Sequence, residues 1–186
     1  METKTYVSEY IKSDFFRING KLGIRRLLLA SLFNRGFIYM MWFRALQSRW
    51  LIIRVVARIM VAINSRRFQI QISKEAQIGY GFFINHGMCV VIAGSAKIGN
   101  NVTISQFVTI GSMHDNAAEI GNNVYIGPSV CIVENVRIGD NVTIGAGAVV
   151  TKDIPDNVTV AGCPAKVVST KSPGRLVYNK WPMDNP

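Results

Sequence analysis

Two histidines, His86 and His114, are the only ones in the 186-residue chain. Histidine is the side chain whose unperturbed pKa lies closest to neutral pH, so it can take a proton from a hydroxyl group and return it later. Both histidines interrupt an otherwise regular sequence pattern, and irregular loops on a rigid scaffold often carry function. We therefore expect both to be functional.

The regular pattern is a six-residue repeat of aliphatic residues. Neither a 3.6-residue helix nor a hairpin meander has this period, whereas a short strand plus a corner does, and three such units close a triangular coil. Glycine and asparagine recur between the aliphatic positions, where a corner often requires a positive φ. The thirteen aliphatic positions are Ile72, Ile78, Ile84, Ile92, Ile98, Ile104, Ile110, Ile120, Ile126, Ile132, Ile138, Ile144 and Val150. They predict a parallel β-helix over residues 72–168.

The period is broken twice, and each break contains one histidine. Eight residues separate Ile84 from Ile92, and ten separate Ile110 from Ile120. Extra residues in a stacked coil must bulge outward, so we expect two surface loops. Cys89 lies three residues from His86, which would permit a Cys-His nucleophile; we favour the alternative that it is a small filler of the corner.

The segment before the repeat is strongly basic. Residues 1–71 carry thirteen Lys or Arg against three Asp or Glu, whereas residues 72–186 carry eight of each. We predict a largely helical segment over residues 1–71 and a C-terminal tail over residues 169–186. The stretch LIIRVVARIMVAI (residues 51–63) fits a basic amphipathic helix, which either lies in an anionic membrane interface or packs on its own protein. No apolar run is long enough to span a bilayer.

The location that we expect is the cytoplasm, with the possibility of attachment to the inner face of its membrane. The N-terminal residues lack the apolar region of a secretory signal. Three cysteines without CxxC spacing indicate a reducing compartment. The basic segment contains no recognisable DNA or RNA motif, so no nucleic-acid partner is expected.

Two stretches resemble hexapeptide-repeat acyltransferases of the serine acetyltransferase and polysaccharide O-acetyltransferase group. They are INHGMCVVIAGSAKIGNNVTISQFVTIG (residues 84–111) and IGAGAVVTKDIPDNVTVAGCPAKVV (residues 144–168). The resemblance implies a left-handed β-helix, a homotrimer, and acetyl-CoA bound in a groove between neighbouring chains. It also implies that no metal is needed.

Several site residues follow from this resemblance. His86 corresponds to the catalytic histidine of the family, so we assign it as the general base. Asn85 stands where the family has an acidic residue. Asn85 and His114 are expected to contact the acceptor. The residues expected to bind the cofactor are Pro128 and Ala146, along the pantetheine, and Lys152 and Lys166, near the phosphates.

The acceptor is predicted from departures from the serine enzymes. Gln71 and Asn85 replace carboxylates of those enzymes, and an amide cannot stabilise an imidazolium as a carboxylate does. The short basic segment resembles that of polysaccharide O-acetyltransferases, so we expect a sugar hydroxyl of capsule or lipopolysaccharide as acceptor. Serine O-acetylation is the alternative, and a non-catalytic β-helical membrane scaffold is a further one. A β-helical carbonic anhydrase would need three histidines, and this chain has two.

Overall fold

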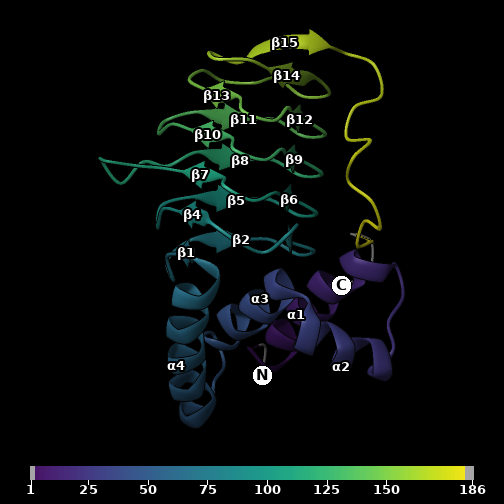
Figure 1. Ribbon diagram of the computed structural model, residues 1–186, viewed down its shortest axis with the longest axis vertical. Helices are drawn as coiled ribbons and strands as arrows, with labels where there is room; N and C mark the ends of the chain where they lie inside the picture. The colour runs from purple at the N-terminus through teal and green to yellow at the C-terminus, as the bar shows by residue number, and fades with distance from the viewer. Residues whose placement is uncertain (1–2, 183–186) are drawn as a thin grey trace.

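A triangular prism of short strands stands on a group of helices in the computed structural model, which describes residues 3–182 and the side chains from residue 7 onward (Figure 1). The first two residues of the predicted N-terminal segment and the last four of the predicted tail lie outside these. The helices are α1 (Thr3–Asn19), α2 (Ile24–Phe33), α3 (Arg35–Ala45) and α4 (Leu51–Phe68). The predicted boundary at residue 71 falls within the first strand and stays a prediction.

The strands form three faces. Face A contains β1 (Ile70–Ile72), β4 (Val90–Ile92), β7 (Thr109–Ile110), β10 (Cys131–Ile132) and β13 (Val149–Val150). Face B contains β2 (Gln77–Ile78), β5 (Lys97–Ile98), β8 (Glu119–Ile120) and β11 (Arg137–Ile138). Face C contains β3 (Phe83–Ile84), β6 (Thr103–Ile104), β9 (Tyr125–Ile126), β12 (Thr143–Ile144), β14 (Thr159–Ala161) and β15 (Lys166–Ser169).

The aliphatic repeat is the core of this prism. Each of the thirteen predicted positions is the last residue of a strand from β1 to β13, and each is buried. Equivalent residues stack in register, as Ile104 does between Ile84 and Ile126. Burying one such side chain contributes about 1.5–3 kcal/mol. The predicted fold, a left-handed parallel β-helix preceded by helices, is confirmed.

Asparagines turn the corner between faces B and C. Asn101, Asn123, Asn141 and Asn157 have φ between 56° and 60°, the left-handed region that asparagine tolerates better than most residues. Neighbouring coils are also joined by side chains, since Asn122 Nδ2 donates to an Asp140 carboxylate oxygen at 3.1 Å. The corner role predicted for asparagine is therefore confirmed.

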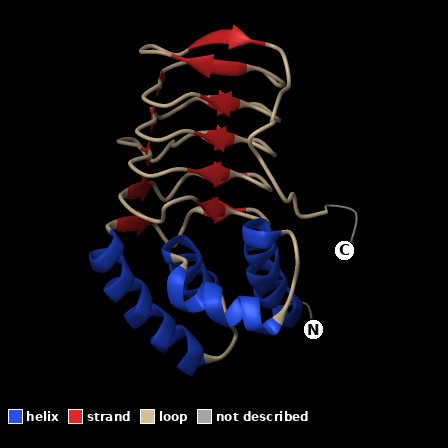
Figure 2. Ribbon diagram, turned by 45° about the vertical axis from the view of Figure 1, so that its right-hand side comes forward, coloured by secondary structure: helices blue, strands red, loops and turns tan. Residues whose placement is uncertain are grey.

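The antiparallel last strand and the path of the predicted tail could not be read from the repeat. β15 pairs antiparallel with β14, whereas every other strand pair of the prism is parallel within the described residues. The chain then returns along the prism to the helices (Figure 2). There the Trp181 amide donates to Asn101 Oδ1 at 2.7 Å, and the Trp181 ring meets Phe16 edge-on. The tail thus ties the top of the prism to α1.

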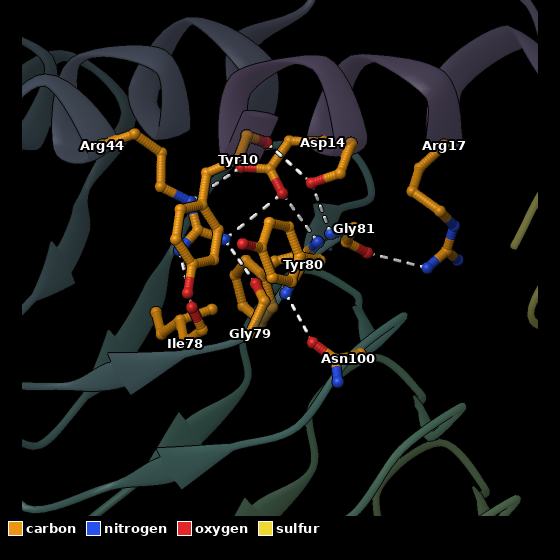
Figure 3. Close-up of polar contacts among 11 residues, drawn as sticks. Tyr10, Asp14, Arg17, Arg44, Ile78, Gly79, Tyr80, Gly81 and Asn100 are labelled. Atoms are coloured by element: carbon orange, nitrogen blue, oxygen red, sulfur yellow. Dashed lines mark hydrogen bonds and ion pairs between the residues drawn. The ribbon is translucent and has the colours of Figure 1, made fainter. Parts of the chain in front are cut away.

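A buried ion pair fastens the helices to the first coil (Figure 3). Arg44 Nε donates to Asp14 Oδ2 at 2.9 Å, and both side chains are only 2% exposed. The remaining Arg44 donors reach the carbonyl oxygens of Ile78 and Gly79 at 2.6 Å each. Asp14 Oδ1 accepts from the Phe82 amide at 2.8 Å. Both charged groups are thereby satisfied by strand backbone as well as by each other.

Candidate active site

His86 lies on a tight turn after β3. Its φ is 63°, that of Gly87 is 53°, and the imidazole is exposed. The preceding residue is fixed, because the Asn85 amide donates to the Ile104 carbonyl at 2.7 Å. A positive φ also occurs at Phe107 in the coil above, so this conformation is part of the corner geometry of the prism. The two extra residues predicted as a surface loop therefore present the histidine outward.

The start of α3 supports this turn. A methyl group on Gly36 would collide with the Ile84 carbonyl oxygen, and one on Gly87 would collide with the Gly36 amide. The backbones of α3 and the His86 turn are therefore in direct contact, which only glycine permits. The helical segment consequently helps to set the position of His86.

Gly36→Ala is expected to shift α3 away from Ile84 and so to displace the His86 turn. A displacement of about 1 Å at a reacting group can lower the rate by about 10²-fold. Steady-state acetyl transfer, with the unfolding midpoint measured in parallel, tests this. Gly23→Ala is the matched control, because a methyl group on Gly23 would meet no atom within 4 Å. Full activity of a folded Gly36→Ala variant would show that α3 does not position His86.

The edge where the chain passes from face C to face A, the C–A edge, carries His86 and most of the predicted cofactor residues. Pro128 and Ala146 occupy it in successive coils, joined by a hydrogen bond from the Gly147 amide to the Pro128 carbonyl at 2.9 Å. Lys166 pairs with Ala161 at the end of β14, so it lies at the same edge further up. This edge is a continuous strip from His86 to Lys166.

Gln106 is a residue of the C–A edge that the sequence analysis missed. It lies one coil above His86, and its Oε1 atom is buried with no hydrogen-bond partner within the described residues. A buried amide oxygen without a partner is costly, and a bound ligand that donates to it would remove that cost. Its place in the repeat, two residues after Ile104 as His86 is two after Ile84, is the signal that could have found it.

His114 lies at a different edge, where the chain passes from face A to face B (the A–B edge). Its Nδ1 atom is 2.8 Å from Glu134 Oε1, and its amide donates to Glu134 Oε2 at 2.9 Å. These contacts, first the His114 side chain and then the backbone amides of His114 and Met113, lower the pKa of Glu134 to about 2. Glu134 thus orients His114, a role that the sequence did not indicate. Lys152 follows β13 at the same edge, away from Lys166.

The two histidines are therefore not brought together within one chain. His86 precedes face A at β4, whereas His114 follows face A at β7. They lie at opposite edges of the same face. A site that used both would have to form between two copies of the chain.

Gln71 and Cys89 lie near the base of face A. Gln71 is exposed on β1, and within residues 3–182 no hydrogen bond joins it to His86. The Cys89 thiol donates instead to Gln69 Oε1 at 3.3 Å. The cysteine is thus paired with an amide rather than with the imidazole.

A cavity of about 350 Å³ opens beside Asn85, between face C and the returning tail. Its lining includes Phe83, Tyr125 and Tyr178, together with Arg17. The Arg17 guanidinium donates to the Gly81 carbonyl and to Thr103 Oγ1, and burial lowers its pKa to about 10. His86 itself is not among the lining residues. Asn85 thus connects the histidine turn with a polar, cationic pocket.

Comparison with known proteins identifies the class that this scaffold belongs to. Residues 117–152 match the family model described as bacterial transferase hexapeptide (six repeats). A serine acetyltransferase of Staphylococcus epidermidis is 42% identical over 67% of this chain and 60% of its own length. The curated relatives are longer proteins, and the chain spans between 36% and 60% of the length of the first three.

Solved structures extend the similarity into the helices. The serine acetyltransferase of Neisseria gonorrhoeae in complex with serine is 31% identical, with a TM-score of 0.76 over 88% of this chain and 70% of its own. The enzyme of Brucella abortus in complex with coenzyme A is 29% identical, with a TM-score of 0.74 over 90% and 70%. The chain belongs to the hexapeptide-repeat acyltransferases, in the group of serine acetyltransferases and polysaccharide O-acetyltransferases.

The prediction of a glycan acceptor in surface polysaccharide synthesis is wrong. The curated relatives and the similar structures are serine acetyltransferases, which favours the alternative of serine O-acetylation. The error came from giving weight to two amides, Gln71 and Asn85, and to a short N-terminal segment. The structural similarity covers nearly nine tenths of the chain, and therefore most of the helical segment as well. The choice of acceptor depends on the whole site, and two residue types were too little to predict it.

Proposed function

We propose that this chain is an acetyl-CoA-dependent serine O-acetyltransferase with His86 as its general base. The observation that carries the proposal is the similarity, over 88% of the chain, to a serine acetyltransferase crystallised with serine. The exposed imidazole on a turn held by α3 supports the assignment of the base. Each substrate then has a part of the surface suited to its chemistry.

The C–A edge suits the acyl donor. Pantetheine is long and carries amide groups, and the strip runs from His86 past Gln106 to the small residues Pro128 and Ala146 in the coils above. The unpaired Gln106 oxygen is an acceptor for an amide N–H of the donor. Lys166 supplies a cation for a phosphate at the upper end of the strip, whereas Lys152 lies at the A–B edge and would have to come from a neighbouring copy.

Transfer needs one proton to move twice. The His86 imidazole takes the proton of the serine hydroxyl as that oxygen attacks the thioester carbonyl. The tetrahedral intermediate then expels the thiolate, which receives the proton back from the imidazolium. The products are O-acetylserine and free coenzyme A, and no covalent enzyme intermediate is formed.

The active assembly is proposed to be a homotrimer. His86 and the donor strip lie at the C–A edge of a chain, and His114, Glu134 and Lys152 lie at the A–B edge. Threefold packing with face A turned toward the axis would bring the C–A edge of one chain to the A–B edge of the next, so each site would have two halves. Light scattering should find three chains per particle; a fully active monomer would refute this arrangement.

The direct test follows the release of coenzyme A with L-serine as acceptor. We expect thiol release that depends on serine, and O-acetylserine identified by mass spectrometry. L-Alanine is the control acceptor, because it lacks only the hydroxyl group. Binding of coenzyme A without serine-dependent release would overturn the choice of acceptor.

Asn85→Asp is expected to lower KM for serine by about tenfold. Serine carries an ammonium group, and a charge-assisted hydrogen bond is roughly twice as strong as a neutral one. Asn85 lies next to His86 and lines the adjoining cavity, so a carboxylate there can reach an acceptor near the base. Gln77→Glu, on the exposed side of face B, is the matched control for added charge. An unchanged KM would place the acceptor away from Asn85.

A further inference from the structure

The helices at the base of the prism expose an unusual amount of apolar surface. On α4, Ile52, Val56, Ile59 and Ile63 lie on one side of the helix, and Ile52 is 78% exposed. The opposite side, with Ala57, Asn64 and Phe68, is buried against the protein. This outward stripe therefore does not serve the core of its own chain.

A second apolar surface lies on α2. Ile24, Leu28, Leu29, Leu32 and Phe33 are each more than half exposed. Both α2 and α4 contact α3, and both lie at the end of the molecule opposite β15 (Figures 1 and 2). Exposed apolar groups thus gather at one end, which we call the basal surface, defined as the exposed residues of α2 and α4 with Trp50. Single exposed aliphatic side chains are common, but a collection of this size marks an interaction surface.

The same region carries only positive charge. Residues 20–70 contain ten Lys or Arg and no Asp or Glu. Arg25, Arg26 and Arg58 are exposed beside the apolar side chains. Trp50, at the start of α4, is 59% exposed, and Arg49 stacks on its ring at 4.6 Å from the centroid. Tryptophan and arginine are residues that favour the boundary between lipid and water.

This charge pattern favours an anionic lipid surface over a second copy of the chain as the partner of the basal surface. A second copy of the chain would bring the exposed Arg25, Arg26 and Arg58 against the same arginines of its partner, with no carboxylate in residues 20–70 to compensate them, which is unfavourable. An anionic lipid surface offers a negative partner for the arginines and an apolar layer for the stripe. Within the described residues no helix is both long and apolar enough to cross a membrane. Attachment would therefore be through the interface.

We propose that the basal surface binds anionic phospholipid bilayers peripherally, with α2, Trp50 and the outward stripe of α4 in the lipid interface. His86 follows β3, which contacts α1 and α3, so the turn that bears it would be held on the membrane side of the prism. The proposal concerns attachment and does not depend on the identity of the acceptor.

The experiment is flotation of the full chain with vesicles of phosphatidylcholine alone and with added phosphatidylglycerol. Binding is expected with the anionic vesicles, and it should fall steeply as the salt concentration is raised. Binding should also shift the tryptophan emission to shorter wavelength, and the Trp50→Phe variant should show a smaller shift. Arg25→Gln with Arg26→Gln should weaken partitioning by about 30-fold, since each basic residue near an anionic surface contributes about a factor of five. Lys171→Gln with Arg175→Gln, in the tail, is the charge-matched control and should change it little.

The apolar contribution is tested separately. Ile52→Ser with Ile59→Ser should weaken partitioning at least about tenfold. Val167→Ser with Val168→Ser, exposed positions on β15 at the other end of the prism, should not. Equal binding to neutral vesicles, or none to anionic ones, would overturn the proposal. A third outcome would also overturn it. If the protein binds no vesicles and the Ile52→Ser/Ile59→Ser variant forms smaller particles than the unchanged chain, the stripe joins copies of the chain instead. Turnover of soluble serine, measured in parallel, reports on the proposed function independently.

Discussion

Replacing His86 with asparagine is expected to lower kcat for acetyl transfer by about 10²–10⁴-fold while binding of coenzyme A is retained, since a positioned base contributes about that factor. Asparagine keeps a polar side chain and tolerates the positive φ of 63° at this turn, so the backbone should be preserved. His86→Ala should lose as much activity but carries the added risk of disturbing the turn. The measurements are kcat, KM and the affinity for coenzyme A.

His114→Ala is the control that separates loss of the base from loss of acceptor binding. His114 is 79% exposed and bonded to Glu134, so its loss should mainly raise KM for the acceptor. A His86→Asn variant that folds, binds coenzyme A and keeps near-normal kcat would remove His86 from the mechanism. A larger loss of kcat in His114→Ala than in His86→Asn would exchange the two roles.

The largest loss of stability is expected for Asp14→Ala. Removing the carboxylate leaves the Arg44 guanidinium buried without a counter-charge, with the backbone carbonyls of the first coil and the Tyr10 ring as its remaining partners. Breaking a buried pair in this way costs about 3–5 kcal/mol in the free energy of unfolding. Denaturant unfolding followed by circular dichroism should show the loss, with the helical signal melting first because the pair joins α1 and α3 to the first coil.

Glu9→Ala is the matched control on the same helix. Glu9 pairs with Lys12 at 2.7 Å, but the two side chains are 34% and 53% exposed. An exposed pair contributes about 0–1 kcal/mol, so little change is expected. Asp14→Leu combined with Arg44→Met should recover part of the loss, because it removes both charges. Equal effects of Asp14→Ala and Glu9→Ala would show that the buried pair does not hold the helices.

The strands could be predicted from the sequence because one rule governs them all. An aliphatic residue every six positions specifies both the inward direction and the stacking, so Ile84, Ile104 and Ile126 were placed correctly without a partner being known. The loops with the two histidines followed from breaks in the same rule. By contrast, the pairing of Asp14 with Arg44 joins residues thirty apart through side-chain geometry that no period encodes.

The rest of the site was hidden for similar reasons. Glu134 reaches His114 across a loop whose path depends on its own backbone conformation, and the unpaired Gln106 oxygen exists only once burial is known. The cofactor residues Pro128, Ala146, Lys152 and Lys166 were assigned as one group, but they divide between two edges. The distance between two residues in the sequence does not by itself reveal whether they occupy the same corner of the prism. The corner follows from the face to which the preceding strand belongs.

The antiparallel pairing of β15 with β14 has a consequence for self-association. A parallel β-helix is a stack in which each coil is a template for the next, so an uncovered last coil presents unpaired strand edges to other molecules. The helices cover one end, and β15 covers face C at the other while reversing the direction that a further parallel coil would need. The reversal therefore acts as a chain terminator for a stack that could otherwise grow into a fibre.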